Sequence, residues 1–309
     1  MRTQRRRAAY SQNFLHSRQL VSALVERSSI GSDDVVIEIG PGRGIITDAL
    51  ASRSRHVITI EKDPRYASQV SRRFGDRANV TVFACDILDF PLPETPFKVF
   101  ANIPYRITTA IVDYLTTGVA PPVDAYLTVQ QEAAARFTGE DEASMVSTCM
   151  KPWFEMSIVH RFRRRDFVPR PSVDSVLLRI SRREPPLIPW DEREQFRRVV
   201  EAIYSAWQPT VVRALRRLLP RDIATDVTAR SEVSLAVRPA QLPIEGWIAV
   251  YEVLSGCDDD RAWASIDLAS GRLRRQQEEL RRPTRTGGSR REPSVRSRRP
   301  RRREPISGD

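Results

Sequence analysis

Four short apolar segments in the first third of the chain each end in residues that could bind a ligand or perform chemistry. In chain order, these end groups are the turn "EIGPGRG" at 38–44, Glu61, Asp86 and the tetrapeptide "NIPY" at 102–105. The carboxyl ends of parallel strands meet at one edge of a sheet, and ligands of open α/β sheets bind there. We therefore expect these residues to line a single crevice.

The first three groups suit an adenosine ligand that carries no phosphate. Glycines in the turn allow close approach of the backbone, and Glu61 could accept hydrogen bonds from both ribose hydroxyls. The turn reads G-P-G-x-G instead of G-x-G-x-x-G, and Glu38 would repel a pyrophosphate. Asp86 could accept from the exocyclic amine of adenine, although an acid there also suits a simple turn or helix cap. The pattern favours S-adenosylmethionine, with Gly40, Glu61 and Asp86 as binding residues.

The tetrapeptide suits attack by an amino group of a planar base. The lone pair of such an amine is delocalised, and two acceptors facing its hydrogens would stabilise the charge that develops. The Asn102 side-chain oxygen and the Ile103 carbonyl are the candidate acceptors. Pro104 would set the backbone direction and Tyr105 would stack on an extruded base. Taken alone, the tetrapeptide is equally compatible with a turn in which Asn caps a helix and Tyr is core.

Strand and helix patterns alternate through the first half of the chain. Strands are expected at 33–40, 56–61, 80–86, 97–102 and 124–130, and helices at 19–28, 44–53, 65–74, 108–118 and 131–137. Such alternation of nearly continuous apolar strands with helices predicts a doubly wound parallel sheet. Two further strands, 157–163 and 175–181, could add an antiparallel edge.

The amino-acid composition indicates where the chain divides into domains. A proline-rich stretch at 183–190 predicts a boundary, and apolar residues then recur at helical spacing. We expect a flexible basic arm at 1–10, a catalytic domain at 11–183, a helical RNA-binding domain at 184–257 and a disordered Arg-rich tail at 258–309. The tail is assigned no fold because the stretch beyond Gly271 lacks apolar anchors.

Charge and cysteine content limit the kinds of partner and cofactor that the chain is expected to have. The formal charge is +11, and residues 271–309 contribute 14 Arg against 5 acids. A basic tail is often only a solvated arm, but binding of the tail to a polyanion is the more specific interpretation. No apolar run is long enough for a membrane span, and neither the three Cys nor the three His have metal-site spacing. A monomer in the cytoplasm, with no membrane and no metal, is expected.

The full motif set resembles the ribosomal RNA adenine N6-methyltransferases. It comprises "SQNFL" (11–15), "EIGPGRG", Glu61, "CDI", "NIPY" and "DFVPRPSVDSVLL" (166–178). The chain is most similar to the erythromycin-resistance (Erm) branch, which modifies one adenine of 23S rRNA and blocks macrolide, lincosamide and streptogramin B antibiotics. Ile103 agrees with that branch, whereas Arg106 stands where many members have Asn. The resemblance implies a Rossmann-like S-adenosylmethionine-dependent methyltransferase sheet with a small helical domain.

The resemblance also implies roles for particular residues. Asn13 and Leu15 should contact the cofactor, together with Gly40, Glu61, Asp86 and Asn102. Tyr105 should stack on the target adenine, and Phe167 should support it from the other side, although an aromatic residue there also suits core packing. Basic residues around the crevice are candidates for phosphate contacts with looped RNA: Arg106, Arg136, Lys151, Arg161, Arg163, Arg164 and Arg165. The run at 161–165 also suits a solvated strand end.

Three alternatives remain open at this point. The chain could be a small-subunit (16S) rRNA adenine N6,N6-dimethyltransferase of ribosome biogenesis, which performs the same chemistry on another RNA. It could be a nucleotide-dependent oxidoreductase of the same fold, which the missing pyrophosphate turn disfavours. It could also be a non-catalytic RNA-binding assembly factor, which the intact "NIPY" disfavours.

Overall fold

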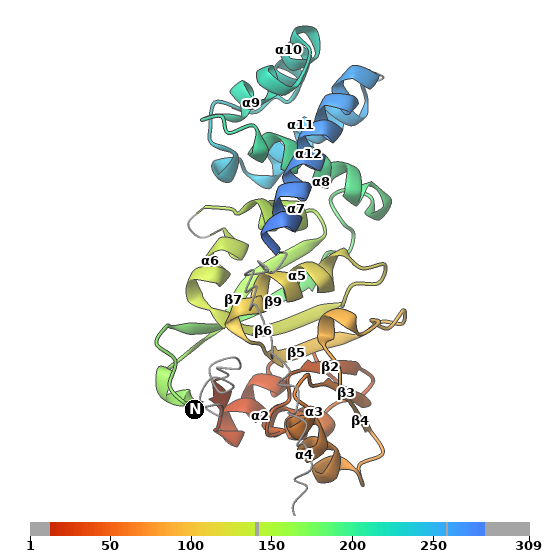
Figure 1. Cartoon of the computed structure of the whole chain (residues 1–309), viewed down its shortest axis with the longest axis vertical. Helices are drawn as coiled ribbons and strands as arrows, with labels where there is room; N and C mark the ends of the chain where they lie inside the picture. Colours follow the sequence, from red (N-terminus) through yellow and green to blue (C-terminus); the bar gives the residue numbers. More distant parts are fainter. Residues whose placement is uncertain (1–12, 140–141, 258, 282–309) are drawn as a thin grey trace, which may run out of the picture.

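A computed structural model describes residues 13–139, 142–257 and 259–281. Its centre is a seven-stranded sheet in the order β4-β3-β2-β5-β6-β9-β7 (Figure 1). The parallel strands are β2 (Val35–Ile39), β3 (His56–Ile60), β4 (Val80–Phe83), β5 (Lys98–Asn102) and β6 (Asp124–Gln130); β7 (Phe154–Phe162) and β9 (Ser175–Arg182) form the antiparallel edge. The predicted fold class is confirmed.

The chain order of the strands reverses between β2 and β5. From β2 the chain proceeds outward to β3 and β4, then returns to β5 on the other side of β2. α3 (Ile45–Ala51) connects β2 to β3, α4 (Pro64–Phe74) connects β3 to β4, and α5 (Thr108–Thr117) connects β5 to β6. α6 (Gln131–Thr138) follows β6, and α2 (Arg18–Glu26) precedes β2. The reversal opens a crevice at the carboxyl ends of the strands.

A second, two-stranded sheet was not predicted. It pairs β1 (Phe14–Leu15) with β8 (Phe167–Val168) in antiparallel register, so that Leu15 lies opposite Phe167. The short 3-10 helix η3 (Arg164–Asp166) leads into β8. This pairing brings the first described segment of the chain to the loop that joins β7 to β9.

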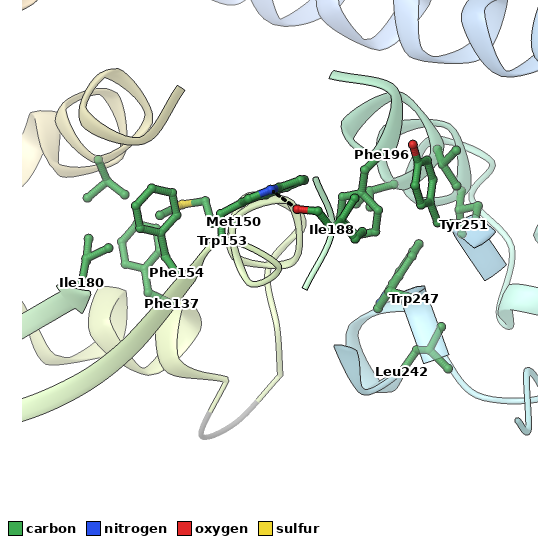
Figure 2. Packing of buried hydrophobic residues seen from close by; sticks show 14 of the residues in the cluster. Phe137, Met150, Trp153, Phe154, Ile180, Ile188, Phe196, Leu242, Trp247 and Tyr251 are labelled. Carbon is green, nitrogen blue, oxygen red and sulfur yellow. Dashed lines mark hydrogen bonds between the residues drawn. The ribbon is translucent and has the colours of Figure 1, made fainter. Parts of the chain in front are cut away.

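A helical part follows the proline-rich segment and fills the upper half of Figure 1. Its helices are α8 (Arg193–Ser205), α9 (Val211–Leu218), α10 (Arg221–Arg230), α11 (Ile244–Ser255) and α12 (Asp260–Arg281). α7 (Met145–Met150) packs against α8 from the sheet side. Trp153 lies at this junction, and its indole N–H donates to the Ile188 carbonyl (2.8 Å; Figure 2). One hydrophobic cluster thus continues from the sheet into the helices.

The expectation that residues 258–309 lack structure is wrong for 260–281. α12 packs along α8 and buries Ala262, Ile266 and Ser270 at a spacing of four residues. Only one of these three is a large apolar residue, which is why the pattern gave no helical signal. The predicted arm at 1–10 and residues 282–309 lie outside the described part of the chain.

The described residues contain neither a membrane-spanning helix nor a cluster of metal ligands. None of their helices has the length and apolarity to cross a membrane. Within the same residues, no three His, Cys, Asp or Glu side chains gather as metal ligands would.

Candidate functional site

A pocket of about 900 Å³ opens where the carboxyl ends of the parallel strands meet. Its walls come from the ends of β2, β3 and β6, from the segments that follow β3, β4 and β5, and from the loop before β9. The polar and glycine residues in the wall are Asn13, Gly40, Glu61, Lys62, Cys85, Asp86, Tyr105, Arg106, Gln130, Arg170 and Ser172. Three of the predicted strand-end groups therefore lie in one pocket, together with Tyr105.

The glycine turn has a backbone conformation that residues other than glycine rarely adopt. Gly40, Gly42 and Gly44 have φ values of 68°, 53° and 77°. A Cβ atom on Gly42 would lie 2.4 Å from the Phe14 ring, so that ring presses directly on the turn. The turn therefore requires glycine both for its conformation and for this contact.

Glu61 directly follows β3 and is buried beside the turn. It accepts hydrogen bonds from the backbone N–H groups of Asp63 (2.8 Å) and Gly42 (3.4 Å). Burial raises the pKa of Glu61, and the two backbone donors oppose that rise. A hydrogen-bond acceptor is thus held at the pocket wall next to the glycine turn.

Asp86 performs two structural tasks in addition to lining the pocket. Its Oδ1 accepts from the Leu88 N–H (3.2 Å) at the start of η1 (Ile87–Asp89), and its Oδ2 pairs with Lys62. Burial alone would raise the pKa of Asp86, but the Lys62 ammonium and the Leu88 N–H together hold it below its usual value. Lys62 was not identified from the sequence, because nothing in its spacing marks it as a partner of Asp86.

Glu38 lies behind the glycine turn and is completely buried. The Thr47 hydroxyl donates to its Oε2 (2.6 Å), whereas Oε1 has no hydrogen-bond partner among the described residues. Burial raises the pKa of Glu38 to about 8. The group is therefore mostly a neutral carboxylic acid at pH 7.

Three chain segments meet at the tetrapeptide. The Asn102 Nδ2 donates to the Asn13 carbonyl (2.7 Å), and the Tyr105 hydroxyl bonds to Ser175 (2.6 Å) and to the Asn13 side chain. Burial raises the pKa of Tyr105, so the phenol stays protonated near neutral pH. Pro104 and Tyr105 line the pocket, Ile103 is buried in the core, and Asn102 is half-buried beside them.

Phe167 and Leu15 do not line the pocket. Both are almost fully buried and belong to a core cluster in which the Phe167 ring packs against Phe162 at 5.2 Å. The Phe167 ring thus lies in the core and outside the pocket wall, and its role beside the target base stays a prediction. The β1–β8 pairing is the reason for this burial, because it directs both side chains into the core beneath the two-stranded sheet.

The predicted RNA contacts fall into two groups. Arg106, Arg136, Arg161, Arg163 and Arg165 are exposed, and Arg106 also lines the pocket mouth. Arg164 is exposed but paired with Asp174 (2.8 Å), and Lys151 is half-buried, with a pKa lowered by burial. Arg170 at the pocket was not predicted; its place after β8 became visible only with the fold.

The chain belongs to the ribosomal RNA adenine dimethylase family, whose model matches residues 3–255. An rRNA adenine N-6-methyltransferase of Saccharopolyspora erythraea is 32% identical over 83% of this chain and 68% of its own. A ribosomal RNA small subunit methyltransferase A of Moorella thermoacetica is 33% identical, over 69% of this chain and 79% of its own.

A solved structure extends the comparison to the fold. The crystal structure of the 23S rRNA methyltransferase ErmE has a TM-score of 0.69 and 31% identity, covering 79% of this chain and all of that one. The class defined by fold and site is thus that of S-adenosylmethionine-dependent methyltransferases. Within it, this chain is an rRNA adenine N6-methyltransferase.

Proposed function

We propose that this enzyme methylates N6 of one adenine in 23S rRNA and so gives resistance to macrolide, lincosamide and streptogramin B antibiotics. The observation that carries the proposal is the similarity to ErmE, which extends over the whole length of that 23S enzyme. The proposed enzyme acts in the cytoplasm as a monomer. It needs no metal, because a methyl group on a positively charged sulfur is already activated.

The lining of the pocket fits S-adenosylmethionine. Carboxylates at Glu61 and Asp86 offer acceptors for ribose hydroxyls and for an adenine amine, and the Gly40 turn allows a close approach. The turn lacks the G-x-G-x-x-G spacing of pyrophosphate-binding loops, whereas the buried and mostly protonated Glu38 would add little charge repulsion at pH 7, contrary to the expectation from the sequence. Asn13 would add a polar contact, and Leu15 a backbone contact. The bound cofactor would supply the methyl group.

We propose that Asn102 and Ile103 act on the amine of the target adenine. Because the Asn102 Nδ2 donates to a carbonyl, its Oδ1 remains as the acceptor. That oxygen and the Ile103 carbonyl would accept the two amine hydrogens and stabilise the positive charge that develops on nitrogen. Tyr105, held through its hydroxyl, would present its ring to the extruded base.

The 16S dimethyltransferase is the second candidate. It is favoured by the 33% identity to the small subunit methyltransferase of Moorella thermoacetica. Its chemistry at the pocket would be the same, so the pocket residues do not discriminate between the two RNAs.

Labelled methyl transfer to unmethylated 23S and 16S rRNA tests the proposal. We expect N6 label at one adenine of 23S rRNA, together with macrolide and lincosamide tolerance in a sensitive host. Asn102→Ala is the matched inactive variant and should lower turnover roughly 10²- to 10³-fold while RNA binding persists. Label confined to 16S rRNA would contradict the 23S proposal. No label on either RNA, with binding intact, would favour the non-catalytic assembly factor.

A further inference from the structure

The turn between α8 and α9 exposes a tryptophan to solvent. Trp207 is 88% exposed, whereas Trp153 and Trp247 in the neighbouring core are 3% and 1% exposed. Large aromatic side chains usually bury most of their surface, so this exposure is uncommon for the residue type. No ring-stacking partner of Trp207 is found among the described residues.

The backbone of Trp207 is also unusual. Its φ is 52°, in the left-handed region that bulky residues rarely adopt. The following Gln208 side chain donates to the Ala206 carbonyl across the same turn (3.4 Å). A large side chain that is exposed to solvent and whose residue has an unfavourable φ angle contributes little to stability, which points to a functional role such as binding.

The chain around Trp207 carries positive charge only. Residues 206–221 contain four Arg and no acid. Three of them lie on α9, where Arg216 and Arg217 follow Arg213 by three and four positions; all three are exposed, on the side opposite the buried residues of that helix. One helix face therefore gathers these three charges.

The α9 arginines differ from other arginines of the helical part. Arg198 pairs with Asp267 (2.8 Å) and Arg230 with Asp226 (3.1 Å). Within residues 13–139, 142–257 and 259–281, by contrast, no ion pair neutralises Arg213, Arg216 or Arg217. Their charge is available to a partner.

We propose that Trp207 and the α9 arginines form a second RNA-binding surface, separate from the pocket, that holds an unpaired nucleotide of the ribosomal RNA. The base stacks on the indole ring, and neighbouring phosphates pair with the guanidinium groups. An exposed aromatic plane that lies a few residues before unneutralised arginines in the chain suits a single-stranded polyanion better than an acidic protein surface, which offers no flat base. The inference rests on the action of this enzyme on ribosomal RNA but not on which subunit supplies it.

The test is the affinity of the full chain for an RNA hairpin with an unpaired adenine loop. Trp207→Ala should weaken binding roughly 5- to 100-fold, the range for loss of one stacked base, while Trp207→Phe should stay within a few-fold of the wild type. Replacing Arg213, Arg216 and Arg217 by Gln should reduce the slope of log affinity against log salt by about 2. Val119→Ala, at an equally exposed apolar residue elsewhere, is the control and should change nothing.

Fluorescence gives an independent readout. RNA should quench the tryptophan emission of the wild type, and this quenching should largely disappear in Trp207→Phe. Unchanged affinity of Trp207→Ala, or quenching that persists in Trp207→Phe, would overturn the inference, as would arginine dependence without any dependence on Trp207. All of these outcomes are measurements of RNA binding. Methylation of 16S instead of 23S rRNA would therefore contradict the proposed function without changing the result of the binding test.

Discussion

Single residues in the site are oriented by partners from distant parts of the chain. The Asn102 carboxamide can present its oxygen only if its N–H₂ is satisfied elsewhere, and the Asn13 carbonyl supplies that acceptor at 2.7 Å. The Tyr105 hydroxyl is likewise held by Ser175, 70 residues further along the chain. These bonds reduce the freedom of the two groups that we propose act on the target base.

Glu38 should make stability depend on pH. Its pKa is about 8 in the folded chain, well above the unfolded value of 4.5, so the folded state keeps a proton that the unfolded state releases. The contribution of Glu38 to the free energy of unfolding should therefore be greatest below about pH 4.5 and fall as the pH rises toward 8, at up to about 1.4 kcal/mol per pH unit for one proton.

Urea unfolding of the wild type and of Glu38→Gln between pH 5 and 8 checks this dependence. Gln has nearly the same shape and cannot ionise, so the difference between the two proteins isolates the carboxyl group. We expect the wild type to lose stability relative to Glu38→Gln as the pH rises. Parallel curves would mean that the buried group does not titrate in this range.

Two elements join parts of the fold that the sequence pattern separates. The β1–β8 pair ties the first described segment to the loop before β9, and α12 lies against α8. The buried Glu201 of α8 accepts hydrogen bonds from Ser270 (2.6 Å) and Arg274 (2.7 Å) of α12. α12 therefore completes the core and also neutralises a buried charge.

Ile266→Ala tests the contribution of α12 to stability. Ile266 is 2% exposed against α8, so its truncation should cost roughly 2–5 kcal/mol. Leu268→Ala on the exposed side of the same helix is the control and should cost no more than about 0.5 kcal/mol. Thermal or urea unfolding measures both. Equal, small effects would mean that α12 contributes little to the folded state.

At the scale of the whole molecule, positive charge is concentrated toward the carboxyl end. Residues 282–309 carry ten Arg against three acids, while the formal charge of the chain is +11. Ending the chain after α12 preserves every contact described above and removes most of that excess. Polyanion binding releases counterions in proportion to the phosphates neutralised, so charge lost from this segment should be visible in the salt dependence.

We expect the chain that ends at Arg281 to bind rRNA more weakly at low salt and with a smaller slope of log affinity against log salt. Filter binding from about 50 to 200 mM salt measures both quantities. S-adenosylmethionine affinity, measured by calorimetry, is the control and should not change. The same slope with and without residues 282–309 would mean that this segment does not contact RNA.

The sequence determined the sheet, the crevice and the order of the ligand-facing groups. Those features depend on local apolar periodicity and on residue types at strand ends, and both can be recognised within short stretches of the sequence. Gly40, Glu61, Asp86 and Tyr105 accordingly lie in one pocket, as expected. Tertiary structure decided what depends on pairing between distant segments. Phe167 turned into the core because β8 pairs with β1, and α12 folded because small and charged residues meet α8. Trp207 is exposed because its turn leaves the helical core, and no local pattern encodes that departure.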